Sequence, residues 1–489
     1  MADSPLQFAL RTATAALCAL VVLSLASGAH AGEEDGAVEF ELPALMAVAP
    51  DAVPDSGVAP ALYTPELTSA SIEPCAWDCP SDSWAGQGWL RHVRVGYDDG
   101  FVVVSERPVE LNDGRAPFVM RVNGWGQLRH TATHYEDPDD DLNQFQLKRA
   151  RLIFSGSVFT PDFEYFLQLD GRSSSGDDMR LLDYYMVYDV GHDLLGRPRG
   201  RLGFKAGKYK MPFSLARQIS GREFEFTDRS VASMYFDVNR SLAWGLFGQE
   251  DVFGKPVHWE FALFNGLVTG GAETGSSGAL DDNFATSMRV YGYPIGDWGA
   301  SQLADLEEHE SLAARVGGGF ASSKINDSGF TEFDSSRVVD SGQTLASLLP
   351  LAVDQYTVSL WAVDASFKLQ GWSLTYEYYF RNISQFQGAA IPDLFDHGFW
   401  LQAGKFVCPE RLELVARWSR VQGTSGTLGV RSESTEEVAG GFVWYVRGQH
   451  AKWTLDITHV NGSPINSQSL DITPGNAGWL FRNQIQFAF

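Results

Sequence analysis

The sequence predicts an all-β fold, a transmembrane antiparallel β-barrel of about sixteen strands. Three observations support this prediction. Apolar and polar residues alternate with a period of two from about Pro117 onward, short and long connections alternate between these segments, and the chain ends on an alternating segment whose last residue is Phe489.

The final segment shows the alternation most clearly, because successive side chains of a strand point to opposite faces. One parity is apolar apart from Asn483 and the other is mostly polar; the two sets are Trp479, Phe481, Ile485, Phe487 and Phe489 against Arg482, Gln484, Gln486 and Ala488. The same pattern recurs at 163–170, 372–381 and 451–458. Alternation alone fits a soluble β-sandwich equally well, so the other two observations carry the membrane prediction.

The connections differ in length in a regular order. The expected strands lie near 117–135, 143–160, 163–173, 179–190, 199–210, 241–252, 257–267, 282–294, 311–324, 354–368, 371–383, 396–407, 411–422, 435–447, 451–462 and 478–489. Short turns at 160–162, 369–371, 407–410 and 448–450 alternate with long connections such as 211–240 and 325–353. Short periplasmic turns and long external loops are typical of outer-membrane barrels. The connections 191–198 and 295–310 depart from this pattern.

The barrel is expected to occupy residues 91–489, behind two segments of different character. Residues 1–31 combine Arg11, an apolar run of about a dozen residues and a small-residue cleavage pattern near Ala31, which predicts a secretory signal peptide. Residues 32–90 are rich in Ala, Pro, Glu and Asp without a sustained period, which predicts an extended or disordered periplasmic segment. We therefore expect export to the outer membrane.

Composition and cysteine content exclude several other classes of protein. A net charge of -24 argues against nucleic-acid binding. Cys75 and Cys79 are close enough in sequence to form a local disulfide in an oxidising periplasm, and Cys408 is left unpaired. We find neither a catalytic motif nor a cofactor or metal-binding fingerprint.

From Val95 to about Gly248 the sequence resembles the phosphate-selective porin O and P family. The pieces that carry the resemblance, in order, are GYDDGF at 96–101, RVNGWGQ at 121–127, FQLKRARL at 145–152, FEYFLQLD at 163–170, GKYKMPF at 207–213, FTDRS at 226–230 and Asn239-Arg240. Beyond this stretch mainly the strand pattern remains. The resemblance implies a sixteen-stranded barrel, usually a homotrimer, with an external loop folded into the pore, and for some members passage of anions or phosphate along a ladder of arginines and lysines.

These properties predict a porin, a passive channel for small hydrophilic solutes, and the family resemblance implies that anions such as phosphate are among them. Its expected partners are outer-membrane lipid and the barrel-insertion machinery, which recognises a C-terminal aromatic such as Phe489. Two alternatives remain open: a barrel enzyme of the lipase type, for which His459 lies on the lipid parity without an indicated serine partner, and a secreted β-rich binding or adhesion protein.

The connection 211–240 is the candidate constriction, because it matches the family's inward-folded loop by position. Its charged residues are Arg217, Arg222, Arg229 and Arg240, opposed by Glu223, Glu225, Asp228 and Asp237. Opposed charges across a narrow pore create a transverse field that filters dipolar solutes. The alternative is that these charges pair with one another and only hold the loop in place.

Four strand arginines, Arg121, Arg129, Arg149 and Arg151, share parity with polar neighbours and are expected to face the lumen. There they attract anions, or form salt bridges with acids such as Asp170 or Glu164. The acidic composition, including the connection 325–353, departs from a simple phosphate pore. The acidic runs 136–141 and 305–310 are expected to lie in water outside the pore.

Overall fold

The structure, a computed structural model, describes residues 93–98, 100–105, 118–171, 179–269, 281–326, 331–339, 343–430, 434–462 and 476–489. The predicted signal peptide, the whole of the predicted N-terminal segment 32–90 and the proposed Cys75–Cys79 disulfide lie outside these residues. Cys408 is exposed and not in a disulfide.

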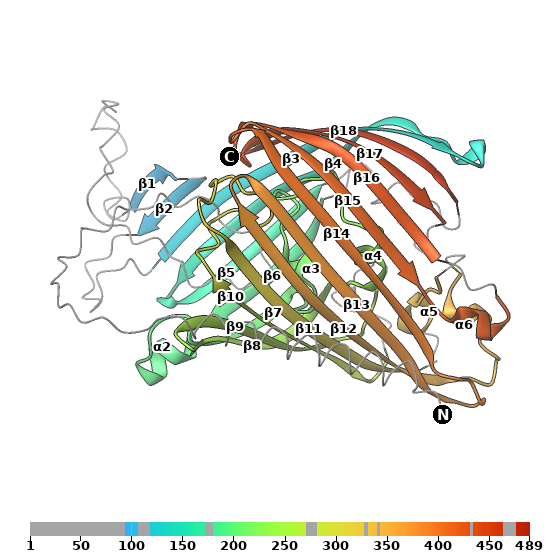
Figure 1. Ribbon diagram of the computed structural model, residues 1–489. Helices are drawn as coiled ribbons and strands as arrows, with labels where there is room; N and C mark the ends of the chain where they lie inside the picture. The colour runs from blue at the N-terminus through green and yellow to red at the C-terminus, as the bar shows by residue number, and fades with distance from the viewer. Residues whose placement is uncertain are drawn as a thin grey trace, which may run out of the picture. The chain divides into compact units, whose positions relative to one another are not determined.

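Sixteen antiparallel strands form a closed barrel, which confirms the predicted fold and strand number. Each strand pairs with the next along the chain, and β18 pairs with β3 from Gly478↔Tyr135 to Ala488↔Trp125, which closes the sheet (Figure 1). The strands are β3 (Phe118–Tyr135), β4 (Asn143–Val158), β5 (Thr160–Gly171), β6 (Met179–Tyr188), β7 (Leu202–Lys210), β8 (Arg240–Val252), β9 (Lys255–Asn265), β10 (Phe284–Ile295), β11 (Ala313–Asn326), β12 (Gln355–Leu369), β13 (Trp372–Gln387), β14 (Leu394–Cys408), β15 (Leu412–Gln422), β16 (Ser434–Arg447), β17 (Ala451–Asn461) and β18 (Gly478–Ala488).

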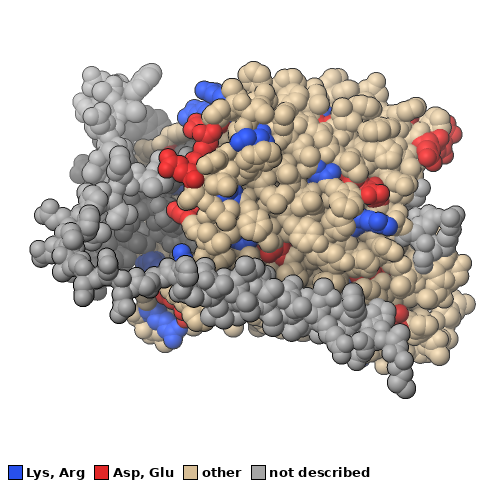
Figure 2. All heavy atoms as spheres, in the orientation of Figure 1, with Lys and Arg blue, Asp and Glu red and all other residues tan. Residues whose placement is uncertain are grey.

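The two faces of the barrel wall have the polarity expected of a membrane barrel. On β18, Trp479 is 46% exposed on the outer face whereas Arg482 is 3% exposed on the inner face. The aromatic parity of β13 is likewise outward, and Glu377 of the other parity is buried inside. The face shown in Figure 2 is mostly uncharged, with scattered Lys, Arg, Asp and Glu. This is the surface that a hydrocarbon environment requires.

A β-hairpin precedes the barrel and was not predicted from the sequence. Strands β1 (Val93–Tyr97) and β2 (Phe101–Ser105) pair with each other, and β2 pairs with the beginning of β3. Arg121 on β3 forms an ion pair with Asp98 between the two hairpin strands, at 3.1 Å. The side chain of Arg121 therefore fastens the hairpin to the barrel.

The tight turns have the backbone geometry that two-residue hairpins need. Gln370 and Gly371 both have positive φ, at 49° and 73°, and so do Phe253 and Gly254, at 51° and 74°. Positive φ at both central residues is the type I′ arrangement, whose twist matches that of the flanking strands. The Gln370-Gly371 turn lies within the short connection expected at 369–371.

Short helices lie in several connections. They are α2 (Val190–Leu195), α3 (Leu215–Gln218), α4 (Val231–Phe236), α5 (Thr331–Ser335) and α6 (Leu345–Leu348), with 3-10 turns η2 (Pro138–Asp140) and η3 (Ser425–Leu428). Helix α2, which begins after the N-cap Asp189, fills one of the two connections that departed from the expected lengths. Among the described residues, every helix is too short or too polar to span a bilayer.

The expectation that 305–310 lies in water outside the pore was wrong at its beginning. The connection 296–312 folds into the barrel, where Asp305 and Ala304 are 0% exposed and Leu303 is 4% exposed. The acidic run follows the apolar residues Leu303 and Ala304, which pack inside the barrel. Because Asp305 is next to them in the chain, it is buried as well. The other acidic run, 136–141, is mostly exposed as expected.

The barrel orientation predicts how substitutions on the outer face behave. Leu374→Arg places a guanidinium on the lipid face of β13 and should destabilise the barrel in lipid by about 2–4 kcal/mol. Leu351→Arg, in a fully exposed position of a connection, should change stability by less than about 0.5 kcal/mol. Denaturant titration of both variants in lipid vesicles checks this. Equal effects of the two substitutions would contradict an outward, lipid-facing Leu374.

Candidate functional site

The connection between β7 and β8, residues 211–239, lies inside the barrel, and we call it the inner loop. Every residue in it is buried except Arg229, which is partly exposed. Two serine caps shape it: Ser214 Oγ accepts a hydrogen bond from Arg217 N at 3.2 Å at the start of α3, and Ser230 Oγ accepts one from Ser233 N at 3.1 Å at the start of α4. These side chains satisfy amides that the first helical turn leaves unpaired.

Carboxylates of the barrel wall hold the inner loop by its backbone. Glu377 accepts hydrogen bonds from the backbone N–H groups of Leu215 and Ala216 at 2.6 and 3.0 Å. Glu437 accepts one from Val231 N at 2.6 Å, and Asp456 one from Thr227 N at 2.9 Å. Both helices of the inner loop therefore begin at a wall carboxylate, which also matches the positive end of the helix dipole.

Three wall arginines converge on Asp228 of the inner loop. Arg129 on β3 donates a short hydrogen bond to it, and Arg149 on β4 donates another at 2.8 Å. Arg482 on β18 lies 3.9 Å from Asp228 and donates to Asp456 at 2.8 Å. One loop carboxylate is thus shared by guanidinium groups from three strands.

A second group of arginines lies on the same side of the lumen. Arg151 on β4 and Arg180 on β6 both contact Asp170 on β5, at 3.4 and 3.2 Å. Asp170 was one of the acids expected to pair with the strand arginines, and in the structure it pairs with Arg151. Together the two groups place arginines of β3, β4, β6 and β18 around two shared carboxylates. We call this part of the lumen the arginine wall, consisting of Arg129, Arg149, Arg151, Arg180 and Arg482.

The remaining arginines of the candidate constriction have partners close to the inner loop. Arg217 lies 3.6 Å from Asp237, Arg222 lies 4.0 Å from Glu223, and Arg240 donates to Asp183 on β6 at 2.8 Å. Arg229 donates to the backbone oxygens of Ala216 and Ile219 at 2.9 and 3.0 Å. The contacts of these four arginines therefore fit the second interpretation of the sequence, in which the charged residues mainly hold the loop in place.

Acidic side chains gather on the other side of the inner loop, against β13 to β16. Glu225 accepts hydrogen bonds from Gln402 and, at 3.1 Å, from Ser373. Glu413 on β15 is completely buried and accepts a hydrogen bond from Tyr445 at 2.8 Å. Arginines therefore predominate in the lumen at β3 to β6 and β18. On β13 to β16 the buried carboxylates outnumber the two buried arginines, Arg381 and Arg417, and we call this part the carboxylate-rich side.

Several wall residues of the site were missed in the sequence. The ones that contact the inner loop or its anchors are Arg289, Arg381, Glu377, Arg417, Glu413, Glu437, Lys452, Asp456 and Arg482. Their polar parity on alternating strands was visible for Glu377, Asp456 and Arg482. What could not be seen was which of them the inner loop would reach.

The connection between β11 and β12 covers the inner loop from the end where the long connections lie. Tyr235 of α4 donates a hydrogen bond to Arg337 O at 2.9 Å, and Arg381 on β13 donates to the same oxygen at 2.9 Å. Glu332 of α5 accepts from Leu267 N at 2.5 Å and from Ser323 Oγ at 3.2 Å. Burial raises the pKa of Glu332 to about 7, and the nearby Asp281 adds to this rise.

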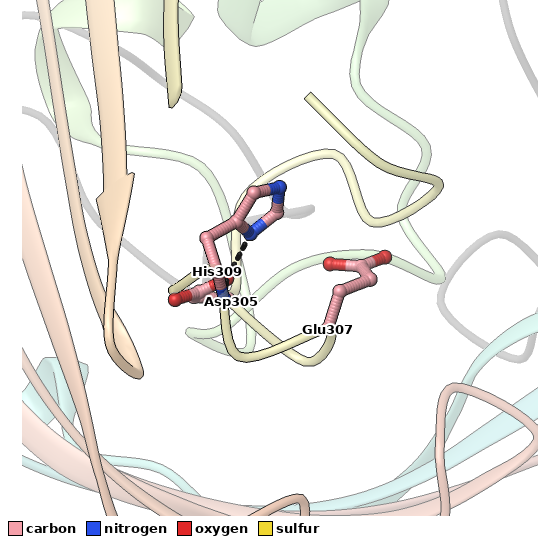
Figure 3. A group of neighbouring side chains, drawn as sticks. All are labelled: Asp305, Glu307 and His309. Atoms are coloured by element: carbon pink, nitrogen blue, oxygen red, sulfur yellow. Dashed lines mark hydrogen bonds and ion pairs between the residues drawn. The ribbon is translucent and has the colours of Figure 1, made fainter. Parts of the chain in front are cut away.

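Three side chains of the connection 296–312 have the composition of a metal site. Oxygen and nitrogen atoms of Asp305, Glu307 and His309 lie within 4.8 Å of one another (Figure 3). Protein groups already engage them: Asp305 accepts from His309 and from Gly371 N, while Glu307 accepts from Ser301 N at 2.7 Å and from Lys368 at 3.4 Å. These bonds favour a structural role for the cluster over metal binding.

Comparisons with known proteins agree with this architecture. The model of a family described as Phosphate-selective porin O and P matches residues 126–489, which extends the resemblance through the C-terminal half. No curated protein matches the sequence.

Three solved structures of low sequence identity align with much of this chain. An anion-selective porin from Comamonas acidovorans is 10% identical with a TM-score of 0.49 and covers 76% of this chain and 99% of its own. The trimer form of OmpT from Vibrio cholerae is 12% identical with a TM-score of 0.47, covering 76% and 99%. Salmonella typhi OmpF in complex with daunomycin is 12% identical with a TM-score of 0.46, covering 81% and 100%.

Asp228 is predicted to balance the arginine wall. Asp228→Asn keeps the side-chain size but removes the charge that Arg129 and Arg149 share, so the local potential becomes more positive. Any anion-to-cation permeability ratio of the barrel should rise, by roughly two- to fivefold in dilute salt where screening is weak. Reversal potentials across a salt gradient measure this. Asp139→Asn, at an exposed position outside the lumen, is the control and should change the ratio little.

Glu332 is predicted to make the covering connection sensitive to pH. Because its pKa in the folded barrel is raised to about 7, it stabilises the folded contacts fully below its ordinary pKa, and this contribution is lost as the pH rises through 7. Amide exchange in 331–339, corrected for the intrinsic rate, should become severalfold faster between pH 5 and pH 8. Glu332→Gln should remove this dependence. A dependence that persists in the glutamine variant would assign it to another group.

Proposed function

Because the chain belongs to the phosphate-selective porin O and P family, it is an outer-membrane diffusion channel for small hydrophilic solutes, and we propose that its pore prefers small inorganic anions. The observation that carries this proposal is the arginine wall, in which Arg129 and Arg149 share Asp228 while Arg151 and Arg180 share Asp170. An anion passing this wall can replace part of the contact that each shared carboxylate makes.

Guanidinium groups suit this task because their planar N–H donors match the oxygens of phosphate and similar anions. Arg149 and Arg151 keep 12% and 10% of their side chains exposed in the lumen, so they remain accessible at the surface of the pore. The carboxylate-rich side around Glu225 and Glu413 opposes them. Opposite charges on two sides of a narrow passage produce a transverse field that orients water and dipolar solutes.

The acidic overall composition is compatible with this preference. Exposed acidic residues such as those at 136–141 lie at the barrel rim, and their potential falls off within about a Debye length of roughly 8–10 Å. Charges inside the lumen act at closer range and in a lower dielectric. Selectivity is therefore determined by the lumen more than by the net charge of -24.

Further properties of the chain belong to the same proposal. We propose that it is a channel rather than an enzyme, that it assembles as a homotrimer, and that a signal peptide is cleaved near Ala31. Phe489 is proposed as the contact for the insertion machinery. Its backbone N–H and C=O pair with Gly124, so the C-terminal aromatic extends the closing seam of the barrel, a position consistent with such a role.

Electrical recording from the purified protein in planar bilayers tests the proposal. We expect ion-conducting steps, a reversal potential that indicates anion preference in a potassium chloride gradient, and a reduction of the chloride current by added phosphate. Conductance with cation preference would overturn the anion proposal and leave the channel itself intact. Absence of conducting steps from a barrel that shows heat-modifiable gel mobility would overturn the porin assignment.

A further inference from the structure

We propose that the connection 296–312 between β10 and β11 forms a second constriction, which enters the pore from the periplasmic side and limits the size of the solutes that pass. We call this segment the periplasmic turn, because it lies on the side of the short connections, which face the periplasm in outer-membrane barrels. The inference rests on the channel function and does not depend on the proposed anion preference.

A lysine of the barrel wall anchors the periplasmic turn. Lys368 on β12 is completely buried, and its Nζ donates hydrogen bonds to Ser301 O at 2.6 Å and Trp298 O at 3.1 Å. The same ammonium lies 3.4 Å from Glu307 and 4.6 Å from the centre of the Trp298 ring. A buried ammonium that is satisfied by one segment holds that segment firmly, because breaking the contacts would leave the charge unpaired.

Charge and backbone contacts reinforce this anchor. Burial opposes ionisation of Glu307, but the Lys368 ammonium and the Ser301 backbone N–H together hold the pKa of Glu307 below its ordinary value. The ion pair therefore persists at neutral pH. In addition, Gly371 N donates to Asp305 Oδ2 at 2.8 Å, and Gln370 N donates to His309 O at 2.7 Å. The type I′ turn between β12 and β13 thus fixes the far half of the periplasmic turn.

The periplasmic turn contacts the inner loop directly. Gln302 accepts a hydrogen bond from Ser220 N at 3.1 Å through its side chain, and its own backbone N–H donates to Glu223 at 3.5 Å. Ala304 packs in an apolar cluster with Phe226 of the inner loop, and Leu306 packs against this cluster. The two segments therefore meet inside the lumen, one entering from each end of the barrel.

The same apolar cluster extends to strands distant from the turn's own attachment. It includes Phe406 on β14, Val415 on β15 and Tyr445 on β16, whereas the turn leaves the wall at β10 and returns at β11. Because these strands are several positions apart around the barrel, the turn crosses part of the lumen instead of lining its rim. The turn thus lies inside the barrel, where its residues Trp298, Leu303 and Ala304 are buried. In this position it narrows the path available to solutes.

The periplasmic turn and the inner loop share the lining of one small cavity. A cavity of about 30 Å³ lies beside Leu303 of the periplasmic turn, bounded by Phe224, Arg229, Trp400 and other residues of the inner loop and wall. A cavity of this volume holds one or a few waters. Removing the turn would open this region toward the periplasm while leaving every residue of the arginine wall in the chain.

Two variants test the inference in single-channel recordings. One replaces residues 299–307 by a short Gly-Ser linker, and the other is Lys368→Met, which removes the anchor but keeps the length and apolar character of the side chain. We expect single-channel conductance to increase by about 1.5- to 3-fold in the shortened variant and by a smaller factor in Lys368→Met, because the narrowest segment dominates the resistance of a pore. The largest polyethylene glycol that enters the pore should increase in parallel.

Lys255→Met, at the exposed first residue of β9, is the matched control and should leave both quantities unchanged. Heat-modifiable mobility in a gel shows whether each variant forms a barrel. If Lys368→Met fails to fold, the shortened variant still tests the inference. Unchanged conductance and polymer cutoff in a folded, shortened barrel would overturn the inference. A wild-type barrel that does not conduct at all would instead contradict the channel function.

Discussion

The burial of charged side chains inside a closed barrel is the constraint on which the rest of this structure depends. A charge removed from water costs several kcal/mol unless a partner compensates it. A polar lumen can meet this demand with water, but here it is met by a segment of the chain itself. Backbone amides of the inner loop donate hydrogen bonds to three wall carboxylates, those of Glu377, Glu437 and Asp456. In the other direction, the carboxylate of Asp228 in the loop forms ion pairs with wall arginines. The charged groups of the wall and those of the inner loop are therefore each compensated by the other.

Along the pore, the inner loop lies between two other segments that contact it. The connection between β11 and β12 covers the inner loop on one side through Arg337, and the periplasmic turn supports it on the other through Gln302. The charged groups that contact the inner loop also differ around the barrel. The arginine wall shares the carboxylates Asp228 and Asp170, whereas Glu225 and Glu413 lie against β13 to β16. A pore of this kind owes its selectivity to short-range contacts in the lumen, and its size limit to segments that enter from both ends.

Period-two alternation predicted the strands, because lipid on one side and a polar lumen on the other impose opposite demands on neighbouring residues. The alternation of short and long connections was also needed to favour a membrane barrel over a soluble β-sandwich. The strands, the short turn at 369–371 and the inward position of 211–240 were predicted, the last from a family resemblance. The pairing of Arg149 with Asp228 was not, because it joins residues far apart in sequence. The interior position of Asp305 was missed because a run of acidic residues usually indicates a solvated surface. The apolar packing of Leu303 and Ala304 and the hydrogen bond from Gly371 N, which reverse that expectation, join residues whose contacts the sequence does not show.

Hydrogen exchange of the inner-loop amides, measured by mass spectrometry on the protein in lipid nanodiscs, tests the central claim most directly. If wall carboxylates hold the loop, peptides that contain Leu215, Thr227 and Val231 should exchange nearly as slowly as the barrel strands, and Glu377→Gln and Glu437→Gln should accelerate exchange locally in the loop. Exchange of these peptides in the wild-type barrel as fast as that of exposed connections would contradict a loop fixed to the wall.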